Sequence, residues 1–299
     1  MRISVTLICL LCVALSSCTS SGKGYLVTEL GTPVSAVLLL PEGECPANGW
    51  PAVILLHDHG ARFEKGWRKV IGNDPEPYYN GMAIGDSLAA HGYAVYCADA
   101  LYWGSRRSAL TQRAFSDSIG GAGEWYAHVL ADDKAGIDYL YSLPNIDSTR
   151  VCAAGFSYGA YRAWNLAAED KRVKACVAAH WMTTLAQNRY NDSWLCMVKK
   201  GFYPTDKGER ADGEWREFCE VAAEIAPRPF LLQYGLHDRL FPVSGVDSCV
   251  QYIDSVYHSQ SEHSENMGKR RFNAEGYDCG HEMTHPHLES WLLFLDQNL

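Results

Sequence analysis

A serine between two glycines is the residue of this chain best suited to covalent chemistry. The stretch Gly155-Phe156-Ser157-Tyr158-Gly159 has the pattern G-x-S-x-G. A short apolar run precedes it, and residues 160–170 are rich in helix formers. In such a sharp strand-to-helix turn, the small flanking residues leave room for a serine hydroxyl held exposed beside a helix N-terminus. We therefore predict Ser157 as a nucleophile, with a glycine-rich turn and a serine cap as the alternative.

A serine hydroxyl needs a base to take its proton and an acid to orient that base. After a G-x-S-x-G turn these partners follow in the chain order Ser, Asp or Glu, His. Asp238 closes the segment Gly235-Leu236-His237-Asp238, directly after an apolar run. His281 follows Cys279-Gly280, after the last predicted strand. We predict Asp238 as the orienting acid and His281 as the general base.

Other carboxylates fit the acid's place less well. Asp247 and Asp254 fall in the next predicted helix, too late for the loop. Asp99 follows an earlier strand and precedes the nucleophile, so we expect it to fix a loop instead.

Other histidines fit the base's place less well. His263 lies in a polar stretch, and His285 and His287 flank Pro286 at the start of the final predicted helix. We expect the last two to be packed or solvated. Because the cluster lacks an H-E-x-x-H pattern and the proline interrupts the helix, the sequence predicts no metal and no other cofactor.

An acyl-transfer site also needs fixed donors for the negative oxygen that develops on the substrate. We predict the backbone N–H of Tyr158, which follows the nucleophile, as one donor. The second donor should come from the loop His57-Asp58-His59-Gly60, which follows an early apolar strand. The amide of Asp58 or of His59 could serve, and His59 is preferred.

Strand and helix patterns alternate along the chain, which predicts an α/β fold with a mostly parallel central sheet and helices on both faces. A single domain is expected over residues 34–299. Residues 180–226 carry no strand pattern and are rich in Trp, Tyr and Arg, so we predict a helical insertion over the active site. Strands are expected at 34–40, 51–57, 93–98, 151–154, 173–179, 229–234 and 271–275, and helices at 81–90, 124–143, 160–170, 243–257 and 287–296.

The amino-terminal residues have the features of an export signal. Arg2 precedes an apolar run, residues 3–15, which is too short to span a membrane, and Leu15-Ser16-Ser17-Cys18 resembles a bacterial lipobox. We predict a signal peptide at 1–17, lipidation of Cys18 and a tether at 18–33. The protein would be an extracytoplasmic lipoprotein attached to the membrane by its N-terminal lipid. An ordinary secretory signal is the alternative.

Composition excludes some partners and leaves the cysteines open. The 299 residues carry a net charge of −9 without a basic cluster, so no nucleic acid partner is expected. Three of the eleven cysteines fall within residues 1–18, and those inside apolar runs should behave as small buried hydrophobes. No pair has zinc-ligand spacing. An extracytoplasmic protein could pair Cys196 with Cys219 or Cys249 with Cys279.

Together these motifs resemble the α/β-hydrolase superfamily, and more narrowly its dienelactone-hydrolase-like and acetyl-xylan-esterase-like members. The stretch Asp99-Ala100-Leu101-Tyr102-Trp103-Gly104-Ser105-Arg106-Arg107 is similar to a D-A-x-x-x-G-x-R stretch of that group. The resemblance implies hydrolysis of a carboxylic ester through an acyl-enzyme on Ser157. True dienelactone hydrolases use a cysteine nucleophile, so the serine argues against that particular reaction.

The substrate is predicted from the residues expected around the cleft. Aromatic faces suit sugar rings and an arginine suits a carboxylate, so Trp103, Trp181 and Arg106 are predicted substrate contacts. The alternative is that such aromatics only pack the insertion to the sheet. Together with the predicted extracytoplasmic location, these contacts favour a substrate that is a glycan ester, from which the enzyme would remove acyl groups. The other hypotheses are a serine peptidase of the prolyl-oligopeptidase type and a catalytically inactive glycan-binding lipoprotein.

Overall fold

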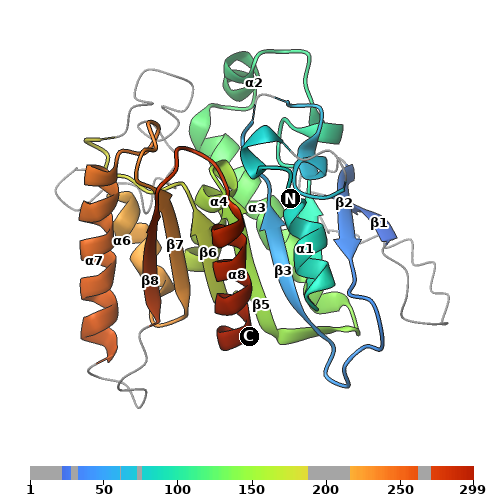
Figure 1. Cartoon of the computed structure of the whole chain (residues 1–299). Coiled ribbons are helices and arrows are strands. Elements are labelled where there is room, and N and C mark those ends of the chain that lie inside the picture. Colours follow the sequence, from blue (N-terminus) through green and yellow to red (C-terminus); the bar gives the residue numbers. More distant parts are fainter. Residues whose placement is uncertain (1–21, 28–32, 61, 73–75, 188–215, 262–270) are drawn as a thin grey trace, which may run out of the picture.

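The computed structural model describes residues 22–27, 33–60, 62–72, 76–187, 216–261 and 271–299. These residues form one eight-stranded sheet with the order β1-β2-β4-β3-β5-β6-β7-β8. From β4 to β8 all neighbouring strands are parallel, whereas β1 with β2 and β2 with β4 are antiparallel. The predicted α/β fold with a mostly parallel sheet is confirmed (Figure 1). The strands are β1 Gly22–Val27, β2 Pro33–Leu39, β3 Trp50–Leu56, β4 Ala94–Ala98, β5 Ile146–Phe156, β6 Ala175–Ala179, β7 Phe230–Gly235 and β8 Phe272–Tyr277.

The predicted tether at 18–33 needs a correction. Residues Gly22–Val27 form β1, which pairs antiparallel with β2 at the edge of the sheet. Its six residues include two glycines and a lysine and so lack the apolar pattern of a buried strand, which an edge strand does not need. Residues 1–21, which include the predicted signal peptide and Cys18, lie outside the described residues.

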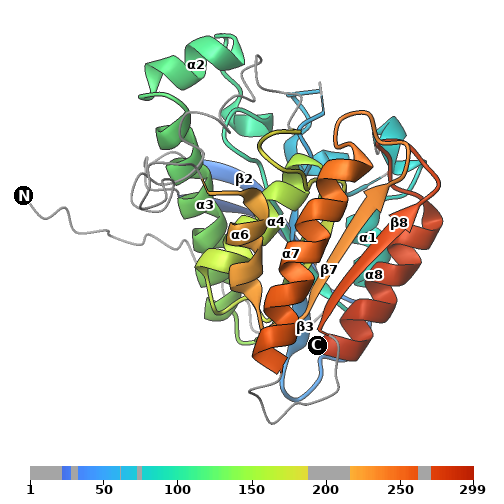
Figure 2. The same ribbon diagram turned by 90° about the vertical axis from the view of Figure 1, so that its left-hand side faces the viewer.

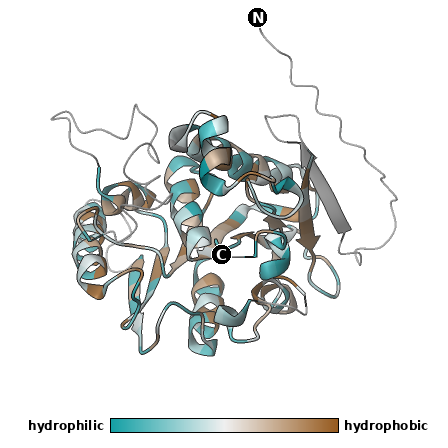
Figure 3. Cartoon of the chain, turned by 90° about the horizontal axis from the view of Figure 1, so that it is seen from above, coloured by the Kyte–Doolittle hydropathy of each residue, from teal (hydrophilic) through white to brown (hydrophobic). Residues whose placement is uncertain are grey.

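Helices cover both faces of the sheet (Figures 1 and 2). On one face of the sheet, alternate strand residues such as Val53 and Leu55 pack against α1 and α8. On the other face, Ala52, Ile54 and Leu56 belong to the core that includes α3 and α4. This alternation follows from the two-residue period of a strand that is buried on both sides. The helices are α1 Ile84–Ala90, α2 Gln112–Ser118, α3 Ala122–Ser142, α4 Tyr158–Glu169, α6 Phe218–Ala222, α7 Val243–Ser261 and α8 His285–Asn298. Seen from above, they carry both hydrophilic and hydrophobic stretches (Figure 3).

The strand order reverses between β3 and β5, which lie side by side. The chain leaves β3 toward β4 on one side, and later leaves β5 toward β6 on the other. In parallel α/β sheets the loops diverge at such a point and open a crevice at the carboxyl ends of the strands. The loop at 57–60 and Ser157 follow these two strands directly, so both lie at the crevice.

The predicted insertion at 180–226 is described only at its two ends, because residues 188–215 lie outside the described residues. At the second end, α6 packs against α4 and α7, and its Phe218 is fully buried against Trp164 and Trp181. This described portion therefore belongs to the helical layer beside the sheet. The helix α2 was not predicted from the sequence; its start is capped by the hydroxyl of Thr111, which accepts a bond from the amide of Ala114.

The described cysteines are free thiols, and most are buried. Cys97, Cys152 and Cys176 are fully buried within strands, as predicted, and burial raises their thiol pKa values. Cys249 of α7 lies against Cys219 of α6 rather than against Cys279. Cys196 lies outside the described residues. Within the described part of the chain, no helix combines the length and apolar content needed to cross a bilayer.

Candidate active site

Ser157 occupies a strained turn between β5 and α4. Its backbone has φ 55° and ψ −124°, and a positive φ is rare for residues other than glycine. The backbone in this turn is closely packed: a Cβ on Gly155 would lie 2.3 Å from the carbonyl carbon of Gly159. A Cβ on Gly159 would lie 1.8 Å from the carbonyl oxygen of Leu56 at the end of β3. The two glycines of the motif are therefore required by close backbone approach on both sides of the serine.

A chain of hydrogen bonds runs from this serine through His281 to Asp238. The Ser157 Oγ lies 2.8 Å from His281 Nε2, and His281 Nδ1 lies 2.7 Å from Asp238 Oδ2. The loops after β7 and β8 hold the two side chains together, because the amides of Leu236 and His237 donate to the carbonyls of Tyr277 and Cys279. The structure thus brings the predicted nucleophile, base and acid within hydrogen-bond reach of one another.

Asp238 is buried and fully bonded. The backbone amides of Leu240 and Phe241 donate to Oδ1 at 2.8 and 3.3 Å, and His281 and His180 both bond to Oδ2. Burial alone would raise the pKa of this carboxyl, but the hydrogen bonds from His180 and His281 outweigh it and hold the pKa well below its ordinary value. The carboxylate is therefore ionised and fixed in orientation, as an acid that orients a base must be.

Two further histidines extend this chain, and the sequence reasoning missed one of them. His180, the residue after β6, lies 3.1 Å from Asp238 Oδ2 through Nδ1 and 3.0 Å from His287 Nε2 through its own Nε2. His287, in the first turn of α8, is fully buried, as a packed histidine was expected to be. The position of His180 at the carboxyl end of a parallel strand was the available signal, since functional residues gather at that edge.

Buried polar groups fix the loop after β3, residues 57–60. Lys69 donates from Nζ to the carbonyl oxygens of Asp58 and His59 at 3.2 and 2.5 Å, and lies 3.4 Å from the Asp58 carboxylate. Burial lowers the pKa of Lys69, an effect that its carboxylate neighbour opposes. The phenols of Tyr78 and Tyr79 also donate to the Asp58 carboxylate. The side chain of Asp58 therefore fixes the loop.

These bonds also fix the direction of one candidate amide. The Asp58 carbonyl accepts from His57 Nδ1 at 2.8 Å and from Lys69, and the His59 carbonyl accepts from Lys69 and Trp103 Nε1. In a trans peptide the carbonyl and the following N–H point in opposite directions. The N–H of His59 therefore points away from Lys69, and a helix-terminal N–H is available at Tyr158, the first residue of α4.

The three predicted substrate contacts need correction. Trp103 is fully buried, stacked on Tyr158 with ring centroids 5.5 Å apart, and Trp181 is nearly so, packed against Tyr161 and Phe218. Arg106 forms a buried ion pair with Asp132 of α3. The two indoles are therefore taken up by packing, and the Arg106 guanidinium is held by Asp132, although its buried Nη2 has no hydrogen-bond partner. The predicted role of Asp99 is supported, because its carboxylate accepts bonds from the amides of Trp67 and Ser105.

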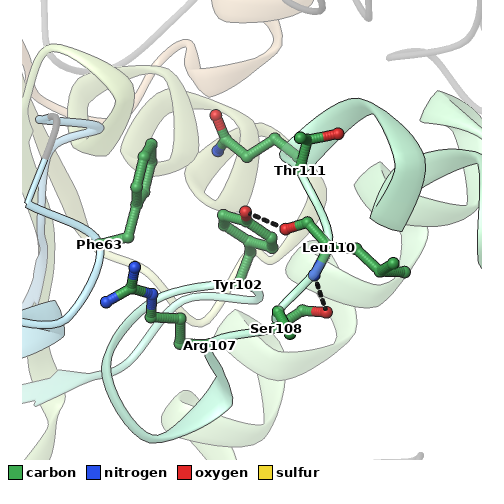
Figure 4. Close-up of a pocket in the computed structure, with 8 residues that line it drawn as sticks. Phe63, Tyr102, Arg107, Ser108, Leu110 and Thr111 are labelled. Atoms are coloured by element: carbon green, nitrogen blue, oxygen red, sulfur yellow. Dashed lines mark hydrogen bonds between the residues drawn. The ribbon is translucent and has the colours of Figure 1, made fainter.

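A solvent-open pocket lies beside the loop after β3 (Figure 4). The carbonyl of Leu110 accepts a bond from the Tyr102 hydroxyl, and Gln112 contacts the imidazole of His59 at 3.2 Å. Arg107, the neighbour of the predicted Arg106, is exposed here. The lining residues are Phe63, Tyr102, Arg107, Ser108, Ala109, Leu110, Thr111 and Gln112.

Two groups of side chains could offer ligands to a metal ion. They are His180 with Cys279 and His287, and His180 with Asp238 and His281, with ligand atoms of each group within 4.8 Å. Hydrogen bonds among the imidazoles and the carboxylate already use most of these atoms. Burial also raises the pKa of Cys279 to about 11, which keeps the sulfur protonated and a poor ligand.

The sheet, the turn at Ser157 and the placement of the loops define an α/β-hydrolase fold. The chain belongs to the dienelactone hydrolase family, whose sequence model matches residues 34–194. It is 29% identical to the Bacillus subtilis protein named "Putative hydrolase YtaP" over 226 residues, 73% of this chain and 69% of that one. The family and its relatives indicate a hydrolytic enzyme.

Solved structures support the fold. The glucuronoyl esterase from Solibacter usitatus matches with a TM-score of 0.58 and 15% identity, over 95% of this chain and 88% of that one. The Porphyromonas gingivalis dipeptidyl peptidase 4 matches with a TM-score of 0.63 and 17% identity, over 93% of this chain. The match spans only 36% of that peptidase. At these identities the likeness concerns the fold alone.

Proposed function

We propose that this protein is a serine esterase that hydrolyses carboxylic esters through an acyl-enzyme on Ser157. The hydrogen-bonded chain Ser157–His281–Asp238 carries the proposal. In it, His281 takes the serine proton during attack on the ester carbonyl and returns it to the leaving alcohol. A water activated by the same imidazole then releases the acid. Asp238 holds the ring and stabilises its charged form.

The negative oxygen of the tetrahedral intermediate binds to two backbone amides in this proposal. The N–H of Tyr158 is one donor, and the N–H of His59 is the other. The bonds from His57 and Lys69 that fix the Asp58 carbonyl support the choice of His59, because that carbonyl and the His59 N–H belong to one peptide group. Neither amide has to move during the reaction, because both belong to backbone fixed by buried partners.

We propose a glycan ester of the acetyl-xylan type as the substrate. This follows from the family and from the predicted export of the chain with a lipid on Cys18, which would place the site outside the cytoplasm. With Trp103, Trp181 and Arg106 buried, we propose that the rim of the open pocket in Figure 4, where Gln112 contacts His59, binds the alcohol part.

Labelling with a fluorophosphonate, followed by an ester panel, tests the proposal. We expect one adduct, on Ser157, together with release of acetate from acetylated xylan. The Ser157→Ala variant should lose both, with a fall in kcat of about 10⁴-fold or more. Absence of an adduct on folded protein would instead favour a glycan-binding role, and turnover of peptides without ester hydrolysis would favour a peptidase. Metabolic labelling with a fatty acid, with Cys18→Ser as the control, tests the lipid.

A further inference from the structure

The acid of the site has two histidine neighbours, and only one of them contacts the serine. His281 bonds to Ser157 and to Asp238, whereas His180 bonds to Asp238 on one side and to His287 on the other. Both additional imidazoles are buried, His180 being 1% exposed and His287 0%. A buried ring that bonds through both nitrogens has a fixed orientation.

A backbone amide sets the direction of every bond in this extension. The N–H of Thr284 can only donate, and it lies 3.1 Å from His287 Nδ1, so that nitrogen is an acceptor. In a neutral imidazole the proton is then on Nε2, which donates to His180 Nε2. The proton of His180 is consequently on Nδ1, where it donates to Asp238 Oδ2. Starting from one main-chain group, both tautomers are determined.

Both rings are kept neutral by burial. Burial lowers the pKa of His287 to about 3, and the adjacent His180 adds to the effect. Burial also lowers the pKa of His180, although its bond to Asp238 opposes this. The groups that face His180 are Asp238, His281, Glu282 and His287, with Cys279 nearby. A neutral donor stabilises the carboxylate without bringing a positive charge that would compete with the protonated His281.

The fold supports the arrangement at some cost. His180 has φ 59°, a strained value for a residue other than glycine, and its amide donates to the carbonyl of Gln233 at 2.7 Å. The side chain of Gln233 is fully buried, accepts a bond from Trp291 Nε1 and contacts the His287 carbonyl at 3.4 Å. One residue of β7 therefore fixes the backbone of both histidines.

We propose that His180 is a positioning residue for Asp238, and that His287 and the Thr284 amide fix its tautomer. Through this link the carboxylate is held where His281 can use it. The inference rests on the proposed esterase function. It adds a second imidazole behind the acid, whose role is to donate to Asp238 without taking part in proton transfer to substrate.

Kinetics of two His180 variants test the role. His180→Leu removes both bonds, whereas His180→Asn keeps an N–H near the Nδ1 position and tolerates the positive φ. We expect His180→Leu to lower kcat about tenfold or more on an activated acetate ester, with little change in KM. The acid limb of its kcat/KM profile should move to higher pH, because a less solvated carboxylate holds the His281 proton more tightly. His180→Asn should restore most of kcat and return the acid limb of the kcat/KM profile toward its wild-type pH. His91→Asn, at the surface, is the control.

Active-site titration with the fluorophosphonate separates the two proposals. If wild-type protein is not labelled, the esterase function fails. If it is labelled and His180→Leu keeps wild-type kcat and acid limb per labelled site, the positioning role fails. A second measurement is independent of turnover and folding of the variants: ¹⁵N-histidine NMR of the wild-type protein. Its spectrum should show the proton on Nδ1 for His180 and on Nε2 for His287, and His287 should not titrate down to about pH 5. The opposite tautomers, or titration near pH 6.5, would overturn the inference.

Discussion

The two loops that flank Ser157 both bury polar side chains, but they balance charge in opposite ways. Behind the acid, Asp238 is surrounded by neutral donors: two backbone amides and the imidazole of His180. Behind the loop after β3, the Asp58 carboxylate is paired with Lys69 and bonded by two tyrosine phenols. One side therefore keeps a net negative charge, and the other does not.

The difference matches the charges that the proposed reaction would develop. The imidazole of His281 becomes positive, so an ionised carboxylate with no cation beside it is favourable there. On the other side the substrate oxygen becomes negative, so a bare carboxylate there would oppose catalysis. Pairing Asp58 with Lys69 removes that opposition. The same lysine holds the Asp58 carbonyl, so the N–H of His59 in that peptide group points away from Lys69. Four predictions test this comparison.

The largest effect should come from neutralising the acid. Asp238→Asn keeps the shape but removes the charge and allows the wrong His281 tautomer, so kcat should fall about 10⁴-fold. Stopped-flow or steady-state hydrolysis of an activated ester would measure it. The matched change Asp99→Asn, at a buried carboxylate that only fixes loops, should leave kcat within about tenfold. Equal losses in the two variants would break the comparison.

The next effect should come from the lysine on the opposite side. Lys69→Met leaves the Asp58 carboxylate buried without its cation and removes one of the two donors to each of the Asp58 and His59 carbonyls. We therefore expect kcat to fall about 10²-fold and stability to fall about 3 kcal/mol. Lys65→Met is the matched control, because Lys65 is a buried lysine paired with Glu76 at 3.3 Å. It should lose similar stability in urea unfolding while keeping kcat per folded molecule. If both variants keep kcat, Lys69 supports only the fold.

A smaller effect concerns acid sensitivity of the fold. Because His287 has a folded pKa of about 3, below its unfolded value, the unfolded chain binds more protons between these values. Its contribution to stability is complete above about pH 6.5 and is lost as the pH falls toward 3. His287→Gln should therefore reduce the decline of Tm between about pH 6.5 and 4. An unchanged slope in calorimetry would show that His287 is not kept neutral.

The smallest effect should come from the rim of the open pocket. Arg107→Ala removes an exposed side chain, so KM for a glycan ester should change by about threefold or less, with no loss of stability. Arg106→Ala should leave KM unchanged and destabilise the protein by about 3 kcal/mol, because it leaves the largely buried Asp132 without its partner. Steady-state kinetics would measure KM and thermal melts would measure stability for the Arg106 and Arg107 variants.

The sequence predicted the parts of the site that local pattern determines. Ser157 is marked by two glycines, and Asp238 and His281 by their order after strands. Strand positions were found because buried parallel strands are continuous apolar runs. The substrate contacts Trp103 and Arg106 were predicted wrongly because residue type says nothing about which partner takes a side chain. The partners here, Tyr158 and Asp132, come from distant segments.

His180 and Lys69 show a second kind of gap between sequence and structure. Neither belongs to a motif, and each acts through residues at least ten positions away along the chain. Their roles arise only when strand ends meet at one edge of the sheet. The edge strand β1 was missed for another reason: its stability comes from pairing with β2 rather than from its own apolar content.

The buried thiols of β4, β5 and β6 have a practical consequence. Cys97, Cys152 and Cys176 are inaccessible and protonated in the native state, so an alkylating reagent can reach them only when the central sheet opens. The alkylation rate of each thiol, measured by mass spectrometry, would therefore report how often its strand opens. The proposed nucleophile, Ser157, directly follows β5, so the modification rate of Cys152 would also report how long the candidate site stays assembled.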